Sequence, residues 1–336
     1  KVGYADADHA AGDAAVAAPP ETFLQRGGHT EYTDKIQFHR FDQREKVEKF
    51  QFRQAFYAAD LVLVNGNHFL GKQQIVVVDP RKEKSLQKKL DRLTDVVLIL
   101  LQTGVKELPD YLKKQLPNHA AIPTLAFGDT PAIATFVAKK QRANRPVLKG
   151  LVLAGGKSQR MGKDKGALHY HGKPQREHAA DLLKKHCPET YISIRDEQQI
   201  TSAYPTLVDT FVGLGPFGAI LSAFRTDPTA AWLVVACDLP LLDKKTLELL
   251  VNQRAVSQVA TAFHNSETGF PEPLITIWEP RAYPVMLEFL SQGYSCSRKV
   301  LINSEVEMIE MKDPSKLLNA NDPSDRERGL QMLERD

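Results

Sequence analysis

The stretch Leu151-Val-Leu-Ala-Gly-Gly156 passes from an apolar run directly into a pair of glycines. A continuous apolar run of this length is typical of a strand buried on both faces of a sheet. The residues that follow, up to Gly166, carry a group of cations: Lys157, Arg160, Lys163 and Lys165. Glycines let backbone N–H groups approach phosphate oxygens, and cations offset the phosphate charge. Segment 151–166 therefore predicts a phosphate-binding loop at the carboxyl end of a strand, where α/β sheets bind ligands.

This loop does not fit the P-loop pattern G-x-x-x-x-G-K-[ST]. Counted from Gly155 the second glycine would fall on Arg160, and counted from Gly156 it would fall on Met161. Asp164 stands where a P-loop has its metal-binding Ser or Thr. An ordinary solvated turn is the alternative interpretation. We favour a ligand-binding loop, because the glycines and the cations coincide at the end of a strand.

Short apolar runs alternate with longer amphipathic stretches along the whole chain. The apolar runs are 61–64, 75–78, 96–101, 122–126, 151–154, 191–194 and 232–236. The stretches with helix-like spacing are 44–58, 81–93, 109–116, 131–141, 175–186 and 244–253. Strands alternating with helices predict an α/β fold with a mostly parallel sheet. A polar segment ending in Pro146 separates a helical pattern from a new strand, so we expect two domains, 1–145 and 146–336.

The composition excludes several classes of protein. The 336 residues include 44 basic and 41 acidic side chains, and a net charge of +3 gives no reason to expect a nucleic-acid partner. No stretch approaches the ~20 uninterrupted apolar residues that span a bilayer, so we expect no membrane partner. Cys187, Cys237 and Cys296 form no C-x-x-C pair. This pattern argues against a disulfide framework or a structural zinc site and favours a cytoplasmic location.

Two further segments carry candidate chemistry. Residues 213–218 spell G-x-G-x-x-G, and Asp238 lies twenty positions beyond, as in a dinucleotide-binding fingerprint. We reject that interpretation because Pro216 has no N–H to offer a pyrophosphate. Asp238 follows the apolar run 232–236, where an ionised carboxylate is costly unless it is paired or bound to a metal. Mg²⁺ favours one or two carboxylates plus phosphate oxygens, so we predict a metal ligand, with a helix cap or turn residue as the alternative.

The loop at 153–166, Leu-Ala-Gly-Gly-x-Ser-x-Arg-Met-Gly-x-Asp-Lys-Gly, closely resembles the signature of the molybdenum cofactor guanylyltransferases. The resemblance implies a Rossmann-like nucleotidyltransferase that transfers GMP from GTP to Mo-molybdopterin with Mg²⁺ or Mn²⁺. The products would be molybdopterin guanine dinucleotide and pyrophosphate. In relatives that use CTP or UTP the loop more often reads Leu-Ala-Ala-Gly. The pair Gly155-Gly156 thus favours guanine, since a side chain there would crowd the edge of the purine.

The resemblance also implies roles for individual residues. It assigns catalytic charge stabilisation to Lys165 and Arg160, and the metal to Asp238. The nucleotide-binding residues implied are Leu153, Ala154, Gly155, Gly156, Lys165, Ser193, Asp209, Gly215, Pro216, Gly218 and Asp238. The residues implied to face the pterin are Arg298, Asn319 and Asn321. Near the ribose the family often carries an asparagine, whereas this chain has Ser193 and Arg195 in that region.

Residues 1–145 resemble, more faintly, the GTP-binding adaptor of the same pathway. Residues 1–9 look like the strand after its P-loop, and 60–66 resemble its Asp-Leu-Val-Leu-Val-Glu-Gly strand with Asn65 in place of the acid. No Walker lysine is visible. We therefore expect a degenerate P-loop-NTPase-type α/β domain that does not hydrolyse GTP but docks onto the transferase or binds a partner. Because the chain starts at Lys1 without methionine, we also expect the native N-terminus to lie upstream.

The implied partners are GTP and Mo-molybdopterin, together with recipient molybdoenzymes or their chaperones. Two alternatives stay open: a cytidylyl- or sugar-nucleotide transferase on the same scaffold, and a non-catalytic GTP-binding regulator. His169 and His171 alternate as in a strand and could chelate a metal, but the resemblance places them in a structural strand.

Overall fold

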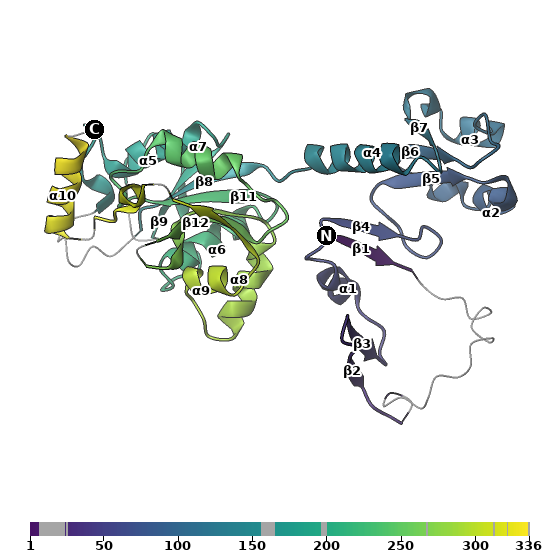
Figure 1. Ribbon diagram of the computed structural model, residues 1–336, viewed down its shortest axis with the longest axis horizontal. Coiled ribbons are helices and arrows are strands. Elements are labelled where there is room, and N and C mark those ends of the chain that lie inside the picture. The colour runs from purple at the N-terminus through teal and green to yellow at the C-terminus, as the bar shows by residue number, and fades with distance from the viewer. Residues whose placement is uncertain are drawn as a thin grey trace. The chain divides into compact units, whose positions relative to one another are not determined.

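A computed structural model describes residues 1–6, 24, 26–155, 165–195, 200–266, 268–311, 313–320 and 322–334. The chain divides into two compact units, Lys1–Asn144 and Arg145–Asp336 (Figure 1). Among the described residues, no helix is both long enough and apolar enough to cross a membrane.

The larger unit is built on a seven-stranded sheet in the order β10-β9-β8-β11-β13-β12-β14. The strands are β8 (Leu148–Leu153), β9 (Thr190–Ile194), β10 (Thr206–Val208), β11 (Ala231–Ala236), β12 (Ala260–Asn265), β13 (Phe270–Trp278) and β14 (Val306–Glu310). Within this sheet β13 runs antiparallel to both of its neighbours, whereas the other pairs are parallel. The predicted α/β fold with a mostly parallel sheet is confirmed, with one reversed strand.

Helices cover both faces of this sheet (Figure 1). They are α5 (Gln175–Lys184), α6 (Pro216–Thr226), α7 (Lys244–Asn252), α8 (Ala282–Ser291) and α9 (Ser297–Ile302). The unit also contains α10 (Pro323–Leu333), which lies away from the sheet near the C-terminus, and the 3₁₀ turns η5 (Lys165–Ala167) and η6 (Pro314–Leu317). α5 and α7 bury Leu183 and Leu250 on one face. On the other face α6 and α8 bury Phe224 and Met286. Because the central strands are covered on both sides, their sequences are apolar without alternation.

A buried ion pair ties three segments of the larger unit together. Arg254, just after α7, donates from Nε to Glu279 Oε1 at 2.6 Å and from Nη2 to Glu279 Oε2 at 2.9 Å. The same Nη2 donates to the carbonyl of Pro146 at 3.0 Å. The Glu279 side chain is fully buried. The pair thereby joins the end of β13 and the loop after α7 to the first residues of the unit.

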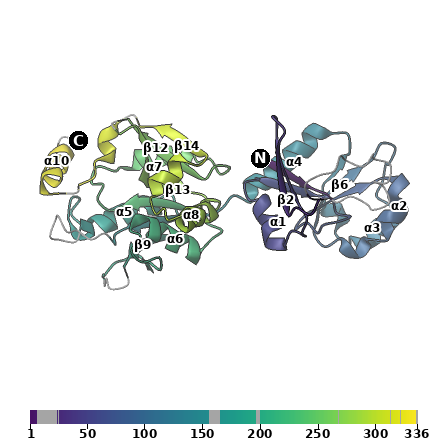
Figure 2. The same ribbon diagram turned by 90° about the horizontal axis from the view of Figure 1, so that it is seen from below.

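The described residues of the smaller unit form three separate ladders. β1 (Val2–Ala5) pairs with β4 (Leu61–Val64), and β5 (Gln74–Val78), β6 (Val96–Leu101) and β7 (Thr124–Ala126) form a second parallel ladder. β2 (Thr30–Asp34) and β3 (His39–Gln43) form an antiparallel hairpin of their own (Figure 2). The helices are α1 (Lys49–Ala55), α2 (Glu83–Gln87), α3 (Asp110–Gln115) and α4 (Thr130–Ala143), with 3₁₀ turns Pro80–Lys82, Leu90–Arg92 and His119–Ala121.

The smaller unit has a modest core. Its buried cluster consists of Val76, Val78, Ile99, Leu112, Leu116 and Ile122. Several apolar side chains on β4 and β5 are more than a third exposed: Val62, Leu63, Ile75 and Val77. The helix predicted over 81–93 is broken into two 3₁₀ turns and the short α2. The strand predicted over 122–126 is shorter, since Pro123 has no N–H for a ladder.

Candidate functional site

The carboxyl ends of β8, β9 and β11 meet at one edge of the larger sheet. The N–H of Ala154 donates to the carbonyl of Ser193 at 3.1 Å, and the N–H of Cys237 donates to the carbonyl of Leu153 at 3.2 Å. Gly155, Ser193 and Asp238 therefore lie at the same edge of the sheet. This is the edge at which parallel α/β sheets bind ligands.

Asp238 is paired through only one of its two carboxylate oxygens. Lys165, at the start of η5, places Nζ 3.1 Å from Asp238 Oδ2, and the two side chains are 19% and 17% exposed. Asp238 Oδ1 is buried and accepts no hydrogen bond from any described residue. A buried oxygen without a donor is costly, so this atom fits a cation as its partner.

The backbone around Asp238 is held from two sides. Gln175 Nε2 donates to the carbonyl of Leu239 at 3.1 Å, and His171 Nε2 donates to the carbonyl of Pro240 at 2.9 Å. From the other side, Ala320 N–H donates to the carbonyl of Asp238 itself at 2.8 Å. His171 also stacks on His178, with ring centroids 3.7 Å apart. His171 thus positions the Asp238 loop in this structure.

Asp209 and Gly155 form a second part of the site. Ser193 Oγ donates to Asp209 Oδ1 at 2.6 Å. Burial raises the pKa of the Asp209 carboxyl, and the Ser193 hydrogen bond and the charge of Arg195 only partly oppose this. A Cβ on Gly155 would lie 3.3 Å from Arg195 Cγ and 3.4 Å from Asp209 Oδ2. The backbone after β8 therefore runs directly beside the Asp209 carboxylate.

The turn before α6 shows why its glycines are needed. Gly213 and Gly215 have φ angles of +82° and +57°, a region that favours glycine. Pro216 opens α6 at its first turn, where a missing N–H is tolerated. A Cβ on Gly218 would lie only 2.2 Å from the carbonyl oxygen of Phe211. Gly218 is therefore required by the packing of α6 against the loop before it.

We predict that Gly218→Ala destabilises the larger unit by about 2 kcal/mol or more, because backbone must move to admit the methyl group. Urea denaturation followed by tryptophan fluorescence measures this. Gly172→Ala serves as the control: Gly172 has a positive φ, but no atom lies near the added Cβ. Its expected cost is about 1 kcal/mol of backbone strain. If Gly218→Ala and Gly172→Ala lost the same free energy of unfolding, the packing argument would be contradicted.

The residues predicted to face the pterin lie partly beside Asp238. Asn319 directly precedes Ala320, whose N–H binds the Asp238 carbonyl. Asn319 Oδ1 and Arg298 Nε are buried and have no hydrogen-bond partner among the described residues. Arg298 lies on α9, which packs against β13. Three other predicted site residues, Gly156, Arg160 and Asn321, lie outside the described residues.

Sequence reasoning missed Glu272, which lies on β13 close to this site. Its Oε1 accepts a hydrogen bond from Leu274 N–H at 3.3 Å. Burial raises the pKa of Glu272, and the charges of Arg298 and Asp238 act on it in opposite directions. The available signal was a charged residue between two prolines in an otherwise apolar strand. Tyr170 was missed as well: burial raises its pKa, and its hydroxyl interacts electrostatically with Asp238.

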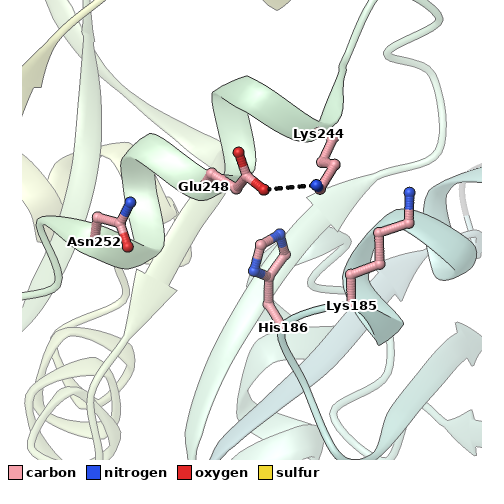
Figure 3. A pocket seen from close by; sticks show the side chains of 5 residues that line it. All are labelled: Lys185, His186, Lys244, Glu248 and Asn252. Carbon is pink, nitrogen blue, oxygen red and sulfur yellow. Dashed lines mark ion pairs between the residues drawn. The ribbon is translucent and has the colours of Figure 1, made fainter.

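A separate hollow of about 620 Å³ lies between α7 and the end of α5 (Figure 3). Its lining residues are Lys185, His186, Lys244, Glu248 and Asn252. Lys244 Nζ lies 3.0 Å from Glu248 Oε1 on the same helix. None of the predicted site residues lines this hollow, so it is distinct from the edge that carries Asp238.

The fold and the site together define a nucleotidyltransferase: a Rossmann-like sheet, a glycine loop after β8, and a lysine-paired carboxylate after β11. The family described as MobA-like NTP transferase domain matches residues 150–307. A probable molybdenum cofactor guanylyltransferase from Synechococcus elongatus is 30% identical over 191 residues, which cover 52% of this chain and 94% of that protein. The chain belongs to this family of molybdenum cofactor guanylyltransferases.

Other relatives extend the comparison. A molybdenum cofactor guanylyltransferase from Pseudomonas putida is 29% identical over 52% of this chain and 92% of its own length. A molybdenum cofactor biosynthesis bifunctional protein from Synechocystis sp. is 35% identical over 189 residues, or 55% of this chain, and the match spans only 54% of that protein. The solved structure of molybdopterin-guanine dinucleotide biosynthesis protein A from Archaeoglobus fulgidus aligns with 56% of this chain and 100% of that one, at 24% identity and a TM-score of 0.47.

Proposed function

We propose that the larger unit transfers GMP from GTP to Mo-molybdopterin, forming molybdopterin guanine dinucleotide and pyrophosphate. The observation that carries the proposal is the half-paired Asp238. One oxygen contacts Lys165, and the other is buried without a donor among the described residues, within the region matched by the transferase family. This arrangement suits a metal-bound triphosphate.

In the proposed reaction the terminal phosphate of the pterin attacks the α-phosphorus of GTP in line with the departing pyrophosphate. Such a reaction requires positioning and charge neutralisation more than covalent catalysis. Asp238 would hold Mg²⁺ or Mn²⁺ through its open oxygen, and the bound ion would neutralise charge on the phosphates. Lys165, with Arg160, would stabilise the charge that builds on the α-phosphate and pyrophosphate.

The other predicted residues fall into two groups around that centre. The backbone of 153–156 and the turn at 215–218 would bind GTP, with Ser193 fixing the orientation of Asp209. Arg298, Asn319 and Asn321 would bind the pterin. The buried, unpartnered atoms of Arg298 and Asn319 support this assignment, because polar atoms left without partners by the described residues are suited to a ligand.

Asp209 supports a preference for guanine. Guanine presents two adjacent donors, N1–H and the N2 amino group, and one carboxylate can accept hydrogen bonds from both. Cytosine presents one donor, the N4 amino group, beside the acceptor N3. We predict that GTP is used in preference to CTP. Asp209→Asn should narrow the GTP-to-CTP ratio of kcat/KM by about ten- to a hundredfold, the equivalent of hydrogen bonds to a charged group. The measurement is pyrophosphate release with Mg²⁺ and Mo-molybdopterin, with mass analysis of the dinucleotide product.

Asp91→Asn is the matched control, since Asp91 is an exposed aspartate of the smaller unit, and it should leave the ratio unchanged. A cytosine dinucleotide product would replace the guanylyl proposal with a cytidylyl one. GTP binding without pterin-dependent pyrophosphate release would instead favour the non-catalytic regulator.

For the smaller unit we propose a non-hydrolytic role: docking onto the transferase, or binding recipient molybdoenzymes or their chaperones. The bifunctional name of the Synechocystis relative supports a chain with two functional units. We place the reaction in the cytoplasm, which the three free cysteines support.

A further inference from the structure

Glu272 lies on the one reversed strand of the larger sheet, next to the strand that ends before Asp238. β11 and β13 pair in a register that sets Val235 opposite Ile275. β11 ends at Ala236, and Asp238 lies in the turn that follows, whereas β13 begins further out, at Phe270, and carries Glu272 in the part of the strand beyond its pairing with β11. Asp238 and Glu272, far apart in the sequence, therefore lie at the same end of two neighbouring strands.

The electrostatic surroundings of Glu272 agree with this placement. The negative charge of Asp238 and the positive charge of Arg298 both act on its carboxyl group. Glu272 is therefore within electrostatic range of both the proposed metal ligand and a cation proposed to face the pterin. Its one hydrogen bond within the described part of the chain comes from the N–H of Leu274 at 3.3 Å. One neutral donor leaves most of the accepting capacity of a carboxylate unused.

A second carboxylate at this position is unfavourable unless a cation offsets it. Two nearby carboxylates repel each other, and the phosphates of a nucleotide add further negative charge. Lys165 contacts Oδ2 of Asp238. Oδ1 remains without a partner among the described residues. A divalent ion between the two carboxyl groups would remove the repulsion and satisfy that oxygen.

We propose that Glu272 is a second protein ligand, beside Asp238, for the divalent cation of the nucleotide site. Mg²⁺ commonly takes one or two carboxylates and completes its shell with water and phosphate oxygens. Within the described ranges no group of three or more His, Cys, Asp or Glu side chains could hold a metal, so the nucleotide would supply the remaining ligands. The inference rests on the proposed function in assuming a metal–nucleotide complex, but not in the identity of the base.

Binding of Mn²⁺ to the full chain tests the inference without any turnover. The free-ion signal in electron paramagnetic resonance gives the Kd, in the presence of a GTP analogue with a methylene group between its α- and β-phosphates. Glu272→Gln should weaken Mn²⁺ binding on the order of tenfold or more. Asp238→Asn should weaken it as well. Glu310→Gln is the matched control, because Glu310 is an exposed sheet residue paired with His264, and it should change nothing.

An unchanged Kd in Glu272→Gln, beside a weakened one in Asp238→Asn, would overturn the inference. If the glutamine variant does not fold, Glu272→Asp takes its place. It keeps the charge but withdraws the carboxylate by one methylene, so it should bind Mn²⁺ several-fold more weakly, and equal affinity would again overturn the inference. A parallel series with the corresponding CTP analogue separates the Glu272 inference from the guanylyl-transfer proposal. If Mn²⁺ binds in the presence of the CTP analogue but not of the GTP analogue, guanylyl transfer is contradicted, while the comparison of Glu272→Gln with the parent protein remains valid.

Discussion

Asp238→Ala is expected to lower the rate of GMP transfer by about a thousandfold or more, the equivalent of about 4 kcal/mol of transition-state stabilisation. The variant loses a carboxylate that contacts Lys165, and with it the open oxygen proposed to hold the metal. The measurement is the single-turnover rate of pyrophosphate release at saturating GTP, Mg²⁺ and Mo-molybdopterin.

The fold should survive this substitution. The contact of Asp238 with Ala320 runs through the backbone carbonyl, which alanine retains. Asp243→Ala is the matched control on the same loop. Asp243 caps α7 by accepting from Thr246 N–H at 2.8 Å, so its loss should cost about 1 kcal/mol of stability and leave the rate near that of the parent. Undiminished turnover in the Asp238→Ala variant would show that Asp238 is not the ligand of the catalytic metal.

Arg254→Ala is expected to destabilise the larger unit by about 3–5 kcal/mol, because it leaves the carboxylate of Glu279 buried without its counter-charge. Urea denaturation measures the loss. The two tryptophans of the chain, Trp232 and Trp278, are both buried in the larger unit. Their fluorescence therefore reports the unfolding of that unit alone.

Two comparisons sharpen this prediction. Lys244→Ala breaks an exposed ion pair with Glu248 and should cost less than about 0.5 kcal/mol. The double variant Arg254→Met with Glu279→Leu removes both buried charges and should recover most of the lost stability, since apolar residues can replace a buried pair. A loss below about 1 kcal/mol in Arg254→Ala would show that Glu279 finds another partner or takes up a proton.

The architecture of the larger unit could be predicted because its strands are buried on both faces. The runs at 151–154 and 232–236 have no polar interruption, and the structure places β8 and β11 side by side at the centre of the sheet. The same logic led to Asp238, a lone carboxylate at the end of an apolar run. In the smaller unit, where packing is sparser, the helices predicted over 44–58 and 81–93 came out too long, whereas the one predicted over 131–141 is slightly shorter than α4.

Glu272 and the Arg254–Glu279 pair could not be predicted in this way. Each depends on the pairing of segments 25 or more residues apart, and on the direction in which β13 runs. Nothing in the local pattern fixes that direction or its register. Gly218 shows a different difficulty: its pattern predicts a ligand-binding role, which stays a prediction, and only the structure reveals that a Cβ there would also clash with the carbonyl oxygen of Phe211.

The strands of the smaller unit that pair on one side only bear on whether the protein self-associates in solution. Among the described strands, β4 and β5 each pair on one side only, and apolar residues such as Val62 and Val77 stand partly exposed on them. Unpaired N–H and C=O groups along an apolar edge are a template for strands of other molecules. Concentrated preparations should therefore self-associate through the smaller unit first, while the sheet of the larger unit stays folded.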